Sequence, residues 1–211
     1  NIFHGIFHNY GIAIILLTLV IRILFWPLTH KSTESMRRMQ ELQPEIKAIQ
    51  AKHKKDPQRM QQETMKLYKE KKVNPMGGCL PMFVQIPVFI ALFTVLRNAI
   101  ELRYAGFLWI ADLSAPENLL MGKIPFVGSL NILPLLMSAS MIWQQKMTSP
   151  AMAATPEQQQ QQKMMMIMMP LMMLFFFYSM PSGLVLYWTT SNLLMIAQTG
   201  IRNFRRKVKE A

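Results

Sequence analysis

The sequence predicts an all-α integral membrane protein with five transmembrane helices and a cytoplasmic helical hairpin, its N-terminus outside and its C-terminus inside. Three observations support this. Of the 211 residues, 51% are hydrophobic and only 16% are charged. The 23 Lys and Arg residues are grouped, with twelve of them between Lys31 and Lys72. Five apolar segments reach or approach the roughly 20 residues that a helix needs to cross a bilayer.

The five predicted spans are separated by loops of very different composition. They are residues 11–28, 79–96, 126–147, 164–180 and 183–201. The third is weaker because Asn131, Pro134 and Ser138 are among the residues that interrupt it, and alone it would fit the core helix of a soluble protein. Five in succession favour a membrane protein. No Met and no basic segment precedes the first span, so it does not resemble a cleaved signal peptide, and we expect a fragment whose natural N-terminus is missing.

The orientation follows from the positive-inside rule. Residues 29–78, 148–163 and the tail 202–211, with Lys146, are placed in the cytoplasm and carry nineteen basic residues. The outer N-terminal segment 1–10 and the outer loop 97–125 carry three. The difference predicts five crossings of the bacterial cytoplasmic (inner) membrane.

The cytoplasmic loop 29–78 predicts a basic helical hairpin with a thin apolar seam. Its apolar residues recur at helical spacing. They are Leu42, Ile46 and Ile49 in the first helix, and Met60 and Leu67 in the second, where the polar Thr64 continues the same spacing. Between them Asp56 is placed to cap a helix and Pro57 to begin it. The hairpin either lies on anionic lipid or meets ribosomal RNA through its phosphates; the alternative is a solvated charge run without a partner.

The outer loop 97–125 predicts an interfacial segment. Aromatic and apolar residues gather in its first half, where amphipathic rings suit the membrane–water boundary. They are Tyr104, Phe107, Leu108, Trp109 and Ile110.

Arg22 stands inside the first span, among apolar neighbours. An arginine near a helix centre costs roughly 2.5–3.5 kcal/mol on insertion scales, and its long stem can also reach back toward the headgroups. Against that alternative, Thr18, Arg22 and Trp26 are spaced to share one helix face. None of the eleven acidic residues lies in a span, so Arg22 has no ion-pair partner there. We therefore expect a hydrated cavity between the helices.

Other spans supply polar residues for such a cavity. They are Gln85, Ser138, Ser140, Thr189, Thr190, Ser191 and Asn192. Each alone is better explained as a hydrogen-bonding contact between helices, but together with Arg22 they favour a polar cavity. The methionines of the fourth span fit simple lipid contact, or a soft surface that accepts many apolar partners in turn.

Four motifs carry a resemblance to a known family. They are TLVIRILFWPLT, LQPEIKAIQ, NPMGGCLPMFVQIPVFIALF and MPSGLVLYWTTSNLL. With these motifs, the chain resembles the membrane core of the YidC family of bacterial membrane protein insertases, which is related to the mitochondrial and chloroplast insertases. The resemblance covers essentially the whole chain, in the family's order and spacing.

The resemblance implies a positively charged hydrophilic groove, open to the cytoplasm and the lipid and closed to the outside. The family's arginine matches Arg22, its threonine one turn earlier matches Thr18, and its groove aromatic matches Trp188 beside Tyr187. Tryptophan stands here where the family commonly has tyrosine. Gln85 matches the border of the groove, and Trp26 and Ser191 complete the predicted substrate-binding set.

The predicted function is that of an insertase or chaperone that receives nascent membrane proteins in this groove and releases their apolar segments into lipid. The implied partners are those nascent chains, the ribosome through the hairpin and tail, anionic lipids and the Sec translocon. A non-translocating assembly scaffold is the alternative; a transporter is disfavoured because five spans do not divide into two equal repeats. We expect no enzyme activity, no cofactor and no metal site, since His4 and His8 have no further ligands in view and the single Cys79 excludes a Cys-rich site.

Overall fold

The fold of the described residues is all-α, as the sequence predicts. The computed structural model describes residues 9–54, 56–74, 77, 80–119, 129–148 and 156–210, so His4, His8 and Cys79 lie outside the described residues. In these ranges there is no β-strand, only two isolated β-bridges.

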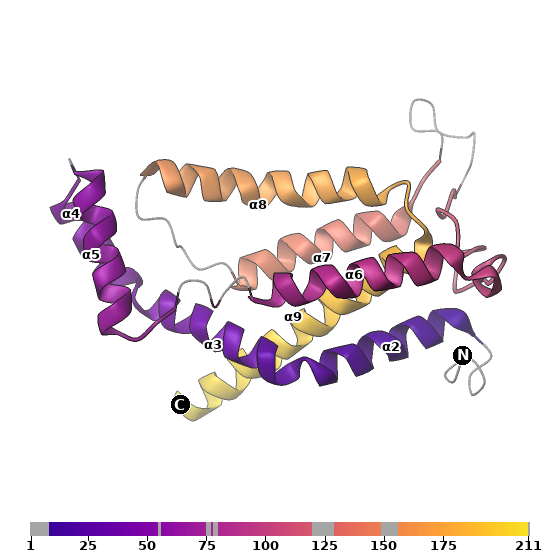
Figure 1. The fold of residues 1–211 in the computed structure, drawn as a ribbon, viewed down its shortest axis with the longest axis horizontal. Coiled ribbons are helices and arrows are strands. Elements are labelled where there is room, and N and C mark those ends of the chain that lie inside the picture. Colours follow the sequence, from indigo (N-terminus) through magenta and orange to yellow (C-terminus); the bar gives the residue numbers. More distant parts are fainter. Residues whose placement is uncertain are drawn as a thin grey trace. The chain divides into compact units, whose positions relative to one another are not determined.

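Figure 1 shows the helices of the described residues. They are α2 (Tyr10–Leu24), α3 (Trp26–Glu41), α4 (Gln43–Lys52), α5 (Pro57–Glu70), α6 (Leu80–Asn98), the 3₁₀ turn η2 (Ile100–Leu102), α7 (Ile132–Thr148), α8 (Pro156–Phe177) and α9 (Ser182–Glu210). No single helix within the described ranges is both long and apolar enough to cross a membrane; α2 and α3 reach that criterion only as a bent pair. The number of spans and their topology thus stay predictions.

Two compact units divide the chain. One contains Asn1–Leu24, Pro87–Met147 and Met169–Ala211, and is called here the helical unit. The other contains Phe25–Ile86 and Thr148–Met168, and is called the hairpin unit. Each has a hydrophobic core of its own.

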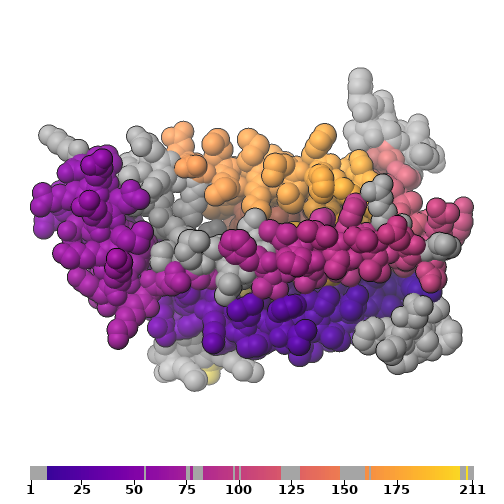
Figure 2. Space-filling view, viewed as in Figure 1, coloured from indigo at the N-terminus to yellow at the C-terminus, as the bar shows by residue number. Residues whose placement is uncertain are grey.

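The core of the helical unit is built where α2, α6, α7, α8 and α9 contribute apolar side chains. Its fully buried members include Leu113, Met137, Leu184 and Tyr187, each no more than 1% exposed. Helix α2 packs directly on α9. Many large apolar side chains of this unit point outward instead, and on the face shown in Figure 2 the surfaces of α2 (indigo) and α6 (magenta) lie uncovered.

Helix α2 ends earlier than the predicted first span. The span was expected to run to Leu28, but α2 ends at Leu24 and α3 begins at Trp26. Pro27 is the reason: it has no N–H to donate, and its ring conflicts with the carbonyl four residues earlier. Proline is tolerated in the first turn of a helix, which is where Pro27 lies in α3.

The predicted helical hairpin is confirmed in the hairpin unit. Asp56 caps α5, accepting a hydrogen bond from the Arg59 backbone N–H at 3.0 Å, and Pro57 begins the helix. Of the predicted seam, Leu42, Ile46 and Leu67 lie in the core of this unit, Ile49 packs against that core, and Met60 and Thr64 are also buried. The core further contains Met39, Tyr68 and Val73, which the seam did not include.

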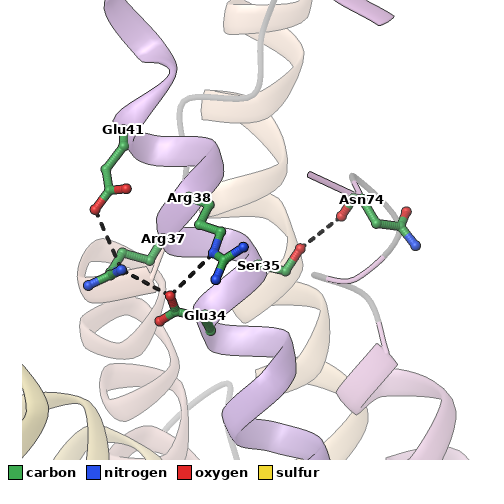
Figure 3. Close-up of polar contacts among 6 residues, drawn as sticks. All are labelled: Glu34, Ser35, Arg37, Arg38, Glu41 and Asn74. Atoms are coloured by element: carbon green, nitrogen blue, oxygen red, sulfur yellow. Dashed lines mark hydrogen bonds and ion pairs between the residues drawn. The ribbon is translucent and has the colours of Figure 1, made fainter. Parts of the chain in front are cut away.

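The side chains of α3 also hold the end of the hairpin (Figure 3). Ser35 donates a hydrogen bond to the Asn74 carbonyl at 2.9 Å, and Ser32 donates to the Gly77 carbonyl at 2.6 Å. On another side of α3, Glu34 and Glu41 pair with Arg37 and Arg38 at one-turn spacing.

Candidate substrate site around Arg22

Arg22 is held by α9 through three hydrogen bonds. Its Nη2 donates to both the carbonyl oxygen and the hydroxyl of Ser191, each at 2.8 Å. Its Nη1 donates to the Met195 sulfur at 3.4 Å. A guanidinium has five N–H donors, and the bonds to Ser191 and Met195 use three of them.

Helical geometry explains why these α9 residues meet Arg22. Tyr187, Ser191 and Met195 recur every four residues and therefore lie one above another on the same face of the helix. Since α2 packs on α9, a long side chain near the end of α2 reaches this face.

No carboxylate neutralises Arg22 within the part of the chain that the structure describes. The ion pairs found there join Glu34 and Glu41 to Arg37 and Arg38, and Glu45 to Lys71, all in the hairpin unit. The partners of Arg22 are a carbonyl, a hydroxyl and a thioether, which are neutral acceptors. Its positive charge is therefore solvated by dipoles and stays available to an anion.

Thr18 lies on α2 one turn before Arg22 and is fully buried, with 0% exposure. Its hydroxyl donates to the carbonyl of Ile14 in its own helix at 2.7 Å. Thr18 thus belongs to the interface that supports Arg22, and its hydroxyl is already used.

The two neighbouring aromatic residues of α9 have different surroundings. Tyr187 is buried in the core, on the α9 face that Ser191 also occupies. Trp188 packs instead on aromatic rings of α6 and α8, with its ring centroid 5.5 Å from that of Phe89 and 5.3 Å from that of Phe177.

Trp26 and Gln85 lie outside the helical unit, which contains Arg22, so their place in the substrate-binding set stays a prediction. Trp26 begins α3, so the continuous helix that would give it a common face with Thr18 and Arg22 ends before it. Both residues fall in the hairpin unit; Trp26 is 50% exposed and Gln85 is partly buried on α6.

Other polar residues of the predicted spans do contact one another. Asn192 donates to the hydroxyl of Ser140 at 3.4 Å and so links α9 to α7. Ser138 donates to the Pro134 carbonyl of its own helix at 2.9 Å and to the Pro170 carbonyl of α8 at 3.5 Å. The two bonds between helices match the alternative in which such residues join helices. Sequence reasoning missed Met195, although its position one turn after Ser191 was a usable signal.

No group of three His, Cys, Asp or Glu side chains suited to a metal ion occurs among the residues with described positions. The arrangement around Arg22 is suited to binding: a partly buried cation with a spare donor can hold an anionic or strongly polar group.

Known proteins resemble the chain over nearly its whole length. Residues 2–209 match the sequence profile of the 60Kd inner membrane protein family. The membrane protein insertase YidC of Syntrophobacter fumaroxidans is 54% identical over 93% of this chain and 35% of its own length. That of Pelobacter propionicus is 49% identical over 90% of this chain and 34% of its own.

A solved structure agrees with these relatives. An active YidC insertase crystal structure with the first transmembrane domain resolved shares 34% identity and a TM-score of 0.67, covering 93% of this chain and 42% of that one. The chain spans about a third of the length of the curated relatives it matches. With a matching profile over almost every residue, the chain belongs to the 60Kd inner membrane protein family.

Proposed function

We propose that this chain is the membrane core of an insertase, which receives nascent membrane proteins beside Arg22 and releases their apolar segments into the lipid of the bacterial inner membrane. The relatives named as membrane protein insertases support the proposal. The observation that carries its mechanism is the position of Arg22, whose guanidinium rests on α9 without a carboxylate partner among the described residues.

The first step is capture of a polar or acidic segment. A carboxylate makes stronger, charge-assisted hydrogen bonds with a guanidinium than a neutral carbonyl or hydroxyl does. An acidic group on an incoming chain therefore competes with Ser191 and Met195 for Arg22. Water in a hydrophilic groove lowers the cost of bringing polar backbone part of the way across the bilayer.

The second step is transfer of the apolar segment to lipid. Many large apolar side chains of the helical unit are exposed, and exposed apolar surfaces are typical of sites that contact a membrane or another protein. The exposed residues on α2, α6, α8 and α9 include Val20, Ile23, Leu24, Ile90, Val95, Leu171, Met172, Phe175 and Leu193. Burial of the substrate helix in lipid supplies the driving force, at about 25 cal/mol per Å² of apolar surface.

In this proposal the chain crosses the membrane five times, with the hairpin and the tail in the cytoplasm. The cytoplasmic segments then carry nineteen basic residues and the outer segments carry three. The ion pairs of the described hairpin occupy Arg37, Arg38 and Lys71. Eight further basic residues in it are exposed: Lys31, Lys47, Lys52, Lys54, Arg59, Lys66, Lys69 and Lys72. Such a surface suits ribosomal RNA or anionic lipid.

The test of the mechanism is insertion into proteoliposomes of two substrates that differ only in an acidic or a neutral outer segment. Arg22→Ala is expected to lower insertion of the acidic substrate about tenfold, which corresponds to about 1.4 kcal/mol, and to spare the neutral one. Arg22→Lys should retain most activity, and Arg38→Ala on α3 is the matched control. Equal insertion of the acidic substrate by Arg22→Ala and wild type would exclude capture by this arginine.

The path of the substrate is tested by photo-crosslinking to a stalled nascent chain. A crosslinker at Met195, which contacts Arg22, should capture the polar segment, whereas one at Leu193, on the opposite face of α9, should not. An assembly scaffold would capture the chain at the same place without making its outer segment resistant to protease. Protease protection therefore separates an insertase from a scaffold.

The topology has an independent test. In a Cys79→Ser background, single cysteines at Lys54 and Glu101 are exposed to an impermeant maleimide in sealed inverted vesicles. Labelling at position 54 and not at 101 is expected. The reverse pattern would overturn the orientation.

A further inference from the structure

Three large side chains form an exposed tip on the segment between η2 and α7. Tyr104 is 89% exposed, Leu108 is 77% exposed and Trp109 is 43% exposed. Their neighbours point the other way, since Ile110 is 3% exposed and Leu113 is fully buried. The five interfacial residues expected from the sequence thus fall into two sets: Tyr104, Leu108 and Trp109 face outward, whereas Phe107 and Ile110 are partly or fully buried.

The backbone holds this tip in an unfavourable conformation. Phe107 and Ile110 exchange two backbone hydrogen bonds of 2.9 Å, so Leu108 and Trp109 form the loop of a two-residue hairpin. Leu108 has φ 53° and Tyr104 has φ 60°, where bulky residues are rare. Glycine is the usual residue where a hairpin loop of two residues needs a positive φ. Apolar side chains are thus kept outward at positions that glycine would occupy more easily.

The polar edge of the tip is satisfied on its own loop. The Trp109 indole N–H donates to the Glu117 carboxylate at 2.8 Å, so the ring offers an apolar face without an unpaired donor. Charged neighbours, Glu101 and Arg103, are exposed beside the tip. This combination of aromatic rings, an aliphatic side chain and nearby charges is typical of the headgroup region of a bilayer.

The tip is fastened to the first turns of two helices. The Ser182 N–H and hydroxyl both donate to the Ala115 carbonyl, at 2.9 and 2.7 Å, and the Gly183 N–H donates to the Leu113 carbonyl at 2.9 Å. The Phe107 ring lies directly against Gly11, where a Cβ atom would collide with it. The tip therefore sits at the level where α2 and α9 begin.

We propose that Tyr104, Leu108 and Trp109 are a lipid anchor that inserts into the outer headgroup boundary of the bilayer. This inference rests on the proposed function, because that function places the first turns of α2 and α9 at the outer membrane surface. The occupant is lipid because the tip belongs to the same compact unit as the exposed apolar residues of these helices. The anchor fixes the depth of the outer loop.

The test measures depth by spin labelling of the full chain in phosphatidylcholine–phosphatidylglycerol vesicles without other protein. In a Cys79→Ser background, nitroxides replace Tyr104 and Leu108 at the tip, and Glu101 and Ala111 as exposed controls on the same segment. At positions 104 and 108, collisions with oxygen should exceed those with a water-soluble nickel chelate, and at 101 and 111 the order should be reversed.

Two results would overturn the anchor. Free access of the nickel chelate at both tip positions would place the tip in water. Protection of both positions from both reagents would mean that a second copy of the chain covers the tip. Neither readout depends on insertion activity, so the anchor and the role of Arg22 fail separately.

Discussion

Both carboxylate oxygens of Glu117 lie within hydrogen-bonding distance of the Leu133 backbone nitrogen, at 3.1 and 3.0 Å. Leu133 is in the first turn of α7, where backbone N–H groups have no acceptor inside the helix. The Glu117 carboxylate therefore caps the N-terminus of α7, although Glu117 lies outside the helix and before it in the chain. Since Glu117 also accepts from Trp109, one side chain joins the exposed tip to α7.

Replacing Glu117 is expected to destabilise the helical unit. Glu117→Ala removes the cap and should lower the free energy of unfolding by about 1 kcal/mol, the usual effect of losing a helix cap. Thermal unfolding in detergent, followed by circular dichroism, measures it. Glu101→Ala, at an exposed position on the same segment, is the control. Equal melting temperatures for the two variants would show that the cap contributes nothing.

Lys72 occupies a position that favours glycine. It follows the end of α5 with φ 53°. The Lys72 N–H donates to the Lys69 carbonyl at 3.1 Å, and the Val73 N–H donates to the Tyr68 carbonyl at 2.9 Å. This is the Schellman arrangement, in which glycine is the usual residue. Lys72→Gly should raise the stability of the hairpin by about 0.5–1 kcal/mol. Lys71→Gly, at a position with φ −81°, should not stabilise the hairpin. Equal effects of the two substitutions would contradict the claim that the positive φ of Lys72 is strained.

Tyr68 gives the hairpin a dependence on alkaline pH. Burial raises the pKa of its phenol above the ordinary value, because the charged form loses its water. The folded state thus keeps the proton after the unfolded state has lost it. Stability is complete below about pH 10, the ordinary pKa, and falls as the pH rises further. The melting temperature of the wild type should fall between pH 9 and 11, and Tyr68→Phe should remove the contribution of this phenol to that fall. An unchanged profile in Tyr68→Phe would refute the role of Tyr68.

Ser191 holds Arg22 with two different atoms, and only one belongs to its side chain. Ser191→Ala leaves the carbonyl acceptor in place and should cost about 1 kcal/mol of stability, the typical net value of one hydrogen bond. Insertion of an acidic substrate should fall less than with Arg22→Ala. A loss as large as that of Arg22→Ala would mean that the hydroxyl, and not the charge, is the essential group.

Features that depend on neighbouring residues alone could be predicted from the sequence. The Asp56 cap and the Pro57 helix start were correct because a side-chain oxygen and a fixed φ act within a few residues. The hairpin seam was equally local. Its C-terminal turn was missed, since lysine at position 72 gives none of the signal that glycine would give.

The end of the first helix shows a signal that was present and given too little weight. Apart from Thr18 and Arg22, the sequence is apolar from Gly11 to Leu28, so a span defined by composition runs through Pro27. The backbone cannot follow it, because hydrogen bonding and sterics near a proline are not measured by hydropathy.

The partners of Arg22 depend on packing between distant segments. The spacing of Thr18 and Arg22 predicts that they share one face of α2. Which face of α9 packs against them depends on the tertiary structure, which the spacing does not determine. Tyr187 and Trp188 are adjacent in sequence, yet one is packed in the core on the Ser191 face and the other against Phe89 and Phe177.

The separate core of the hairpin has a genetic consequence. A substitution at Met39 or Ile46, each only 1% exposed, removes packing from a cluster that shares no buried residue with the core of the helical unit. Under the proposed function, such alleles should leave the protein abundant in the membrane fraction while its substrate proteins accumulate unprocessed. Alleles that break the core around Leu184 should instead lower the amount of protein itself. Immunoblotting beside a client-processing assay would sort damaging variants into these two groups.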